Sequence, residues 1–180
     1  VLDNIIVGKR KPEELYNRIF VVSAYNNVTN WLLEHKKTGE PGVYVQFLEN
    51  GDYSTGLDSL CQRLLLINQG FKEIGLNLKE ADEFITFRIG QAKMMLRSLS
   101  NVLASGYVKP DDICLAAREI LASIGEAHSA WNSVNILVNN GITARFIDLC
   151  GFNDSQPITI DERIHKAFSG IDYSKVLCIA

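Results

Sequence analysis

Polar side chains that could contact a ligand gather between residues 23 and 30, directly after an apolar run. Ser23 and Thr29 carry hydroxyl groups, and the asparagines of the same segment carry amides. The apolar run predicts a β-strand, and the residues from Trp31 predict a helix. In open α/β sheets, ligands bind at such a junction because free backbone N–H groups and the helix dipole point there. The junction is a candidate binding site, although Thr29 could instead cap the helix and Ser23 could bond its own backbone.

The other titratable side chains match no catalytic or metal-binding spacing. Glu126, taken alone, reads as a solvated residue of a helix. The histidines read as packing or surface residues, because no Ser or Cys nucleophile pattern accompanies them: His35, His128 and His165. Four acidic residues could be taken for a metal cluster, but their spacing fits no ligand motif: Asp148, Asp154, Asp161 and Glu162. Asp161 reads as a helix cap, so we expect no metal site.

An alternation of strands and helices must position these residues. Three strands are predicted, at residues 18–24, 143–149 and 175–180, and the first should be central and buried on both faces. Helices are predicted from Trp31, over 57–74, over 78–103 with Gly106 as its stop, over 110–139, and over 161–168. We expect a break or a close packing contact at Gly125. The order predicts an α/β fold with a mostly parallel sheet sandwiched by helices, and a long helical insertion after the first strand.

Charge and composition exclude several classes of protein. The chain has 180 residues and a formal net charge of -3, so no broad basic surface argues for nucleic acid or an anionic membrane. The four cysteines lack Cys-x-x-Cys spacing and read as buried free thiols in a reducing compartment. No signal-like or membrane-spanning run is found, and we expect a cytoplasmic protein. Because the chain starts at Val1 and stops at Ala180 inside an apolar run, we also expect a fragment of a longer protein.

Two segments resemble the aspartate kinase family. Residues 21–30 are similar to the family segment in which a strand ends in Ser-Ala and a helix begins at Thr-Asn. Residues 123–129 follow the family's helix motif Ser-x-Gly-Glu-x-x-Ser. The resemblance implies an incomplete amino-acid kinase fold, with residues 1–180 forming the aspartate-binding part of the catalytic domain. Residues 34–42 resemble forms from ectoine-producing bacteria.

The activity that this resemblance implies is transfer of the ATP γ-phosphoryl group to the β-carboxylate of L-aspartate. Thr29 would hydrogen-bond the substrate carboxylate, Ser23 would line the floor near the transferred phosphate, and Glu126 would bind the α-ammonium group. The family's Lys-x-Gly-Gly-Thr/Ser loop should precede Val1, and the nucleotide-binding half should follow Ala180. We therefore expect no catalytic residue within residues 1–180, and expect ATP and Mg²⁺ to act in a full-length, homo-oligomeric parent with regulatory domains.

The chain departs from the family pattern at two places. Tyr25, Asn26 and Asn27 stand where the family has small residues and glycines, and His128 replaces the arginine common after the glutamate. Asparagine adopts positive φ only at some cost. Two alternatives stay open: another amino-acid kinase, acting on glutamate, acetylglutamate or a nucleotide, or a non-catalytic helical module that packs against a partner. The Ser-x-Gly-Glu motif after long helices argues against the first.

Overall fold

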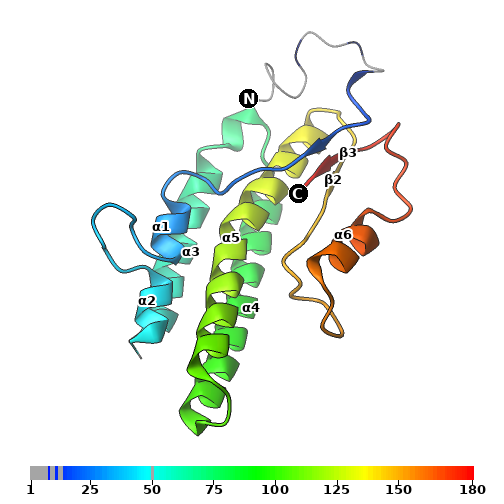
Figure 1. Cartoon of the computed structure of the whole chain (residues 1–180). Coiled ribbons are helices and arrows are strands. Elements are labelled where there is room, and N and C mark those ends of the chain that lie inside the picture. Colours follow the sequence, from blue (N-terminus) through cyan, green and yellow to red (C-terminus); the bar gives the residue numbers. More distant parts are fainter. Residues whose placement is uncertain (1–7, 9–10, 12–13, 50) are drawn as a thin grey trace.

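A small parallel sheet packs against the end of a long helical layer in the computed structural model, which describes residues 8, 11, 14–49 and 51–180 (Figure 1). The elements follow in this order: β1 (Ile19–Phe20), α1 (Val28–Leu32), α2 (Val43–Leu48), α3 (Tyr53–Gln69), a 3-10 turn (Lys72–Ile74), α4 (Leu78–Ser105), α5 (Pro110–Asn139), β2 (Ala144–Phe146), α6 (Ile160–Phe168) and β3 (Leu177–Ile179). The α/β class and the helical insertion between the first two strands are confirmed.

All described strand pairs are parallel, as predicted, but the order in the sheet is β1-β3-β2. The prediction that the first strand is central is therefore wrong. Ile19 of β1 is 50% exposed and Val21 just after it is 84% exposed, whereas every residue of β3 is buried. The β-branched run after Arg18 has strand propensity, but which strand lies in the middle depends on the crossovers. The strands are also two or three residues long, shorter than predicted.

The long helices begin and end at local signals. Asp52 caps α3 by accepting a hydrogen bond from the Thr55 N–H at 3.0 Å, so α3 begins four residues before the predicted Leu57. Asn77 caps α4, which ends at Gly106 with φ 68°, as predicted. Pro110 opens α5. The last helix, α6, begins after Thr159, which forms a capping box with Glu162, so the prediction that Asp161 is the cap is wrong.

Helix α5 is unbroken at Gly125, and the close-packing alternative is the correct one. A Cβ atom on Gly125 would lie 2.7 Å from the Cβ of Ala24 and 3.1 Å from Cγ1 of Val28. Only glycine lets the first turn of α1 approach α5 this closely. The contact fixes the segment after β1 against the middle of α5.

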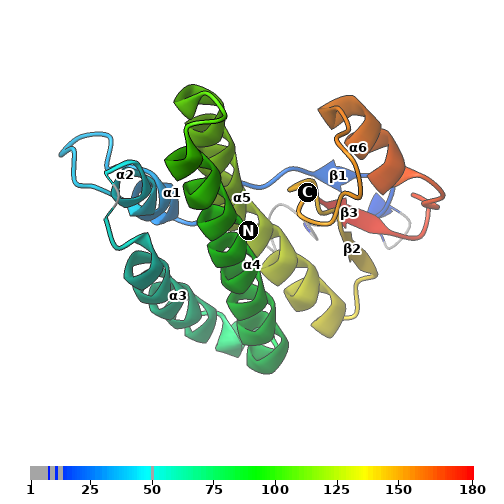
Figure 2. The ribbon, with the colours of Figure 1, turned by 90° about the horizontal axis from the view of Figure 1, so that it is seen from below.

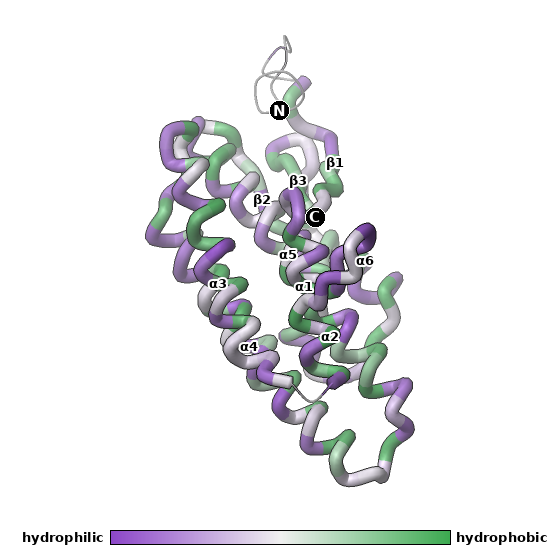
Figure 3. The backbone as a smooth tube through the Cα atoms, turned by 90° about the vertical axis from the view of Figure 1, so that its left-hand side faces the viewer, coloured by the Kyte–Doolittle hydropathy of each residue, from purple (hydrophilic) through white to green (hydrophobic). Residues whose placement is uncertain are grey.

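Helix α5 also joins the two halves of the molecule. Its first half packs with α1 to α4 through Ile113, Leu121 and Ile124, and its second half packs on the sheet through Ala130 and Leu137. Seen from below, α3 and α6 lie at opposite ends, with α4 and α5 between them (Figure 2). Hydrophobic and hydrophilic segments alternate along α3 and α4, as expected for helices with one buried face (Figure 3).

Candidate functional site

Three contacts hold the segment after β1 on α5 beside Glu126. Besides the approach of Ala24 to Gly125, the Ser129 hydroxyl donates a 2.8 Å hydrogen bond to the carbonyl of Ser23, across 106 residues of sequence. The ring of Tyr25 meets His128 edge-on, with centroids 5.3 Å apart. The fold therefore brings together the two segments that the sequence analysis singled out.

A pocket of about 160 Å³ lies at the carboxyl ends of the strands. Its walls come from the segments after β2 and β3 and from α5, and they include Glu126, Phe146, Asp148, Cys150 and Ala180. This edge of a parallel sheet is where open α/β folds bind ligands.

Glu126 carries the uncompensated charge of this pocket. Its Oε2 atom is buried and has no hydrogen-bond partner among the described residues. A buried carboxylate oxygen without a donor is costly, and a ligand that brings an ammonium or other N–H group removes the cost. Glu126 is thus not the solvated surface residue that its sequence position alone suggests.

Asp148 is the second carboxylate of the pocket, and Arg88 neutralises it. The guanidinium of Arg88 forms an ion pair with Asp148 at 2.5 Å, and its side chain is only 4% exposed. It lies between the rings of Phe84 and Phe152, at 5.3 and 4.9 Å from their centroids. Burial by itself would raise the pKa of Asp148, but the hydrogen bonds from Arg88 and from the Cys150 N–H outweigh it and lower that pKa.

Sequence reasoning missed Arg88 and dismissed Asp148. One signal could have found Arg88: it is a charged residue within the apolar face formed by Ile85, Ile89 and Ala92. A cation at such a position needs an anionic partner nearby. The partner, 60 residues away, could not be chosen among the acidic residues from the sequence alone.

The segment that holds Ser23 and Thr29 packs on α5 at Gly125 and Ser129, but neither hydroxyl residue lines the 160 Å³ pocket that Glu126 borders. Thr29 is in the first turn of α1, whose N-cap is Asn27 with φ 65° and no side-chain cap bond. The interpretation of Thr29 as a helix cap is therefore wrong. Within the described part of the chain, neither hydroxyl is engaged in a side-chain hydrogen bond, so both are available to a ligand.

His128 is a buried packing residue, in agreement with its interpretation from sequence. Its Nε2 atom lies 2.7 Å from Oδ1 of Asn68, whose amide nitrogen donates to Asp82 at 2.8 Å. Because Oδ1 can only accept, Nε2 must carry the proton. Burial lowers the pKa of His128 to about 4, so the ring is neutral at pH 7.

Tyr25 joins the same buried group. Its ring packs on Phe71 with centroids 5.1 Å apart, and the Asn132 amide forms a hydrogen bond with its hydroxyl. Burial raises the pKa of Tyr25 to about 12, and the bond with Asn132 opposes part of that rise. The side chain thus lies inside the helical layer and does not fill the ligand side of the loop.

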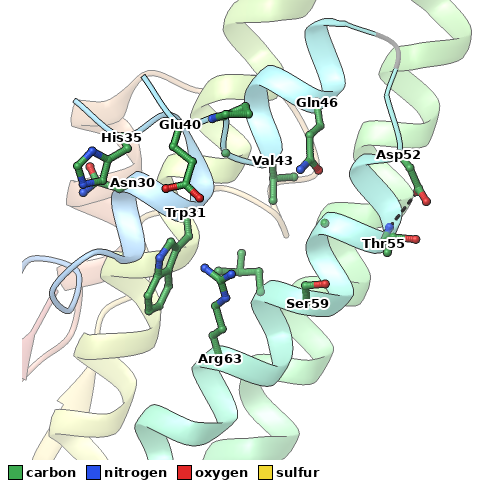
Figure 4. Close-up of a pocket in the computed structure, with 14 residues that line it drawn as sticks. Asn30, Trp31, His35, Glu40, Val43, Gln46, Asp52, Thr55, Ser59 and Arg63 are labelled. Carbon is green, nitrogen blue, oxygen red and sulfur yellow. Dashed lines mark hydrogen bonds between the residues drawn. The ribbon is translucent and has the colours of Figure 1, made fainter. Parts of the chain in front are cut away.

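A larger cavity, of about 380 Å³, opens between α3 and the segment that joins α1 to α2 (Figure 4). The guanidinium of Arg63 stacks over Trp31 at 5.0 Å in its wall, and Glu40 and Gln46 face it. Its lining includes none of Ser23, Thr29 and Glu126, and it lies away from the strand ends. Size alone therefore does not mark it as the ligand site.

The structure accounts for the remaining candidate residues without a metal. Asp154 pairs with Arg163 at 2.7 Å, and Glu162 belongs to the capping box of α6. Across the described ranges no group of three or more His, Cys, Asp and Glu side chains is arranged to hold a metal ion.

The four cysteines are free, and Cys61 and Cys178 are buried. No described helix is long and apolar enough to cross a membrane.

Comparison with known proteins gives one match among curated sequences. The chain is 44% identical, over an alignment of 183 positions, to "Aspartate kinase Ask_Ect" of Stutzerimonas stutzeri (strain A1501). The chain is homologous to an aspartate kinase. The alignment includes 100% of the chain and 38% of that aspartate kinase, so the chain spans less than half the length of its relative.

The homology to an aspartate kinase confirms the resemblance found in the two motif segments. Because the whole chain is aligned, the similarity includes the segments that hold Ser23, Thr29 and Glu126. No family model matches the chain, and no solved structure matches it.

Proposed function

We propose that residues 1–180 form the aspartate-binding part of a catalytic domain with the amino-acid kinase fold. The full-length protein then transfers the ATP γ-phosphoryl group to the β-carboxylate of L-aspartate. One observation carries the proposal: the buried, unpartnered Oε2 atom of Glu126 in a pocket at the carboxyl ends of parallel strands. The homology to an aspartate kinase supports this proposal. The name of that relative, Ask_Ect, agrees with the resemblance of residues 34–42 to aspartate kinases of ectoine-producing bacteria.

Glu126 binds the α-ammonium group of aspartate in this proposal. Asp148 is already paired with Arg88, so the pocket keeps one net negative charge for one cation. A charge-assisted hydrogen bond in a partly desolvated pocket is worth about 1.5–3 kcal/mol. The glutamate thus contributes both affinity and orientation of the substrate.

Thr29 and Ser23 complete the site from the other side. The Thr29 hydroxyl donates to a substrate carboxylate, and Ser23 lines the floor near the transferred phosphate. Their segment is held on α5 by the contacts of Ala24 and Ser129, so both hydroxyls have a fixed position relative to Glu126. Phosphoryl transfer depends on such positioning more than on covalent participation of the protein.

The residues that line the 160 Å³ pocket do not fit MgATP. No lysine lines the 160 Å³ pocket, and its carboxylates are Glu126 and the Arg88-paired Asp148. Phosphates and Mg²⁺ need additional cations and carboxylate ligands. We therefore assign these residues the binding of aspartate, and assign the nucleotide and Mg²⁺ to the rest of the full-length protein.

Trapping of the acyl phosphate with hydroxylamine tests the proposal. The full-length protein with MgATP should form the hydroxamate from L-aspartate, and not from glutamate or acetylglutamate, while residues 1–180 alone should form none. Preference for glutamate or acetylglutamate would place the protein among other amino-acid kinases. Absence of any substrate-dependent product would favour the helical interaction module. Light scattering on the same sample measures the proposed homo-oligomeric state.

A further inference from the structure

Tyr25 and His128 each belong to one of the two places where the chain departs from the family pattern, and the fold puts their rings in contact. Their ring centroids lie 5.3 Å apart with an interplanar angle of 81°. Tyr25 is two residues after Ser23, and His128 is two residues after Glu126. Each aromatic ring is thus attached to one side of the proposed aspartate site.

The spacing along α5 separates the roles of neighbouring residues. Gly125, His128, Ser129 and Asn132 recur at three- and four-residue steps, so they share one face of the helix. That face contacts Ala24, Tyr25 and the Ser23 carbonyl. Glu126 is turned about 100° from Gly125 and borders the pocket. A rigid contact on the helix face that includes Gly125 and His128 therefore fixes the position of Glu126 relative to the segment 23–29.

Tyr25 is fixed from several directions. Phe71 packs on one side of its ring, the edge of His128 on another, and the Asn132 amide bonds the hydroxyl. His128 in turn is held by Asn68, which is bonded to Asp82 of α4. The loop after β1 is thereby anchored to α3, α4 and α5 together.

A neutral ring at position 128 suits this environment. His128 is fully buried, and its hydrogen-bond neighbours among the described residues are the amides of Asn68 and Asn132, not carboxylates. An arginine there would place a permanent charge among the buried amides of Asn68 and Asn132, and a buried charge is costly unless an anion pairs with it directly. The large ring of Tyr25 occupies the space beside the histidine.

We propose that Tyr25 and His128 are positioning residues that hold the Ser23–Thr29 loop at a fixed distance from Glu126. This inference rests on the proposed function. Neither side chain touches the substrate. Loss of the ring contact should loosen the loop and weaken aspartate binding, while the nucleotide, bound elsewhere, should be unaffected.

The test compares Tyr25→Leu with Tyr25→Phe in the full-length protein. Tyr25→Leu should raise the KM for aspartate about tenfold, because small misplacements of binding groups are costly, and should leave the KM for ATP within about twofold. Tyr25→Phe keeps the ring and should retain a KM near that of the wild type. Tyr53→Leu is the matched control, since Tyr53 makes a similar ring contact with Phe47 in the same hydrophobic cluster, at 5.5 Å.

An unchanged aspartate KM in Tyr25→Leu would overturn the inference, and so would an equal rise in Tyr53→Leu, which would indicate general loosening of the helices.

Hydrogen exchange distinguishes a failure of this inference from a failure of the proposed function. In Tyr25→Leu, amides of residues 23–29 and 125–129 should exchange faster than in Tyr53→Leu, even if the wild type shows no aspartate kinase activity. Equal exchange in the two variants would also overturn it. A double variant with His128→Leu should raise the KM no further than Tyr25→Leu does.

Discussion

Two carboxylates border the same pocket, and their surroundings give them different roles. Asp148 is paired with Arg88, whereas Glu126 has a buried oxygen without a partner among the described residues. The protein satisfies the first carboxylate, and we propose that a ligand satisfies the second. The distinction depends on hydrogen-bond partners and not on residue type or spacing.

Replacing Glu126 by glutamine tests this distinction. Glu126→Gln preserves shape and removes the charge, so the KM for aspartate should rise about ten- to a hundredfold, and the KM for ATP should not change. The unfolding free energy without ligand should rise by about 1 kcal/mol, because an unpaired buried charge is lost. Steady-state kinetics and urea unfolding measure the two effects. Glu119→Gln, on an exposed turn of the same helix, is the control, and an equal response there would remove Glu126 from the site.

His128 should make stability depend on pH in the mildly acidic range. Burial lowers its pKa from 6.5 to about 4, so the unfolded chain binds the proton more tightly than the folded one. The contribution of neutral His128 to the free energy of unfolding is fully present above pH 6.5 and is lost as the pH falls toward 4. The loss amounts to at most about 3 kcal/mol. Urea unfolding at several pH values should show this slope in the wild type and a smaller one in His128→Gln. Equal slopes of the unfolding free energy against pH in the two proteins would show that His128 does not cause the pH dependence.

At the scale of elements, two glycines inside long helices should respond oppositely to alanine. A Cβ on Gly125 meets Ala24 at 2.7 Å, whereas nothing lies within 4 Å of one on Gly90 of α4. Gly125→Ala should lower the unfolding free energy by about 1–3 kcal/mol through overpacking. Gly90→Ala should raise it by about 0.5–1 kcal/mol through helix propensity. Melting curves of both variants measure the difference, and stabilisation by Gly125→Ala would contradict the close contact.

For the whole molecule, α5 should make the helical layer and the sheet unfold together. Leu137 packs with the sheet, while Trp31 belongs to the helical cluster at the other end of α5. Leu137→Ala should cost about 2–5 kcal/mol. In a variant with Trp131→Phe, Trp31 fluorescence should report the same shift in urea midpoint as circular dichroism does. A Trp31 transition that stays at the wild-type midpoint would show that the two parts unfold separately.

The sequence by itself determined the features that depend on neighbouring residues. Gly106 and Pro110 place the end of α4 and the start of α5, and three- and four-residue periodicity predicts the long helices. Alternation of element types predicts parallel strands, and the two motif segments indicate the aspartate kinase family. These signals act over one or two helical turns, or are local patterns of residue types, so they can be read without the fold.

Only the tertiary structure decided which residues meet. It placed β1 at the edge of the described sheet, kept α5 unbroken at Gly125, paired Arg88 with Asp148 and turned Tyr25 inward onto His128. Each of these features joins segments at least 60 residues apart or depends on the order in which strands pair. Burial and hydrogen-bond partners are properties of such long-range contacts, and they separate a carboxylate with a buried, unpartnered oxygen from one that has its partner.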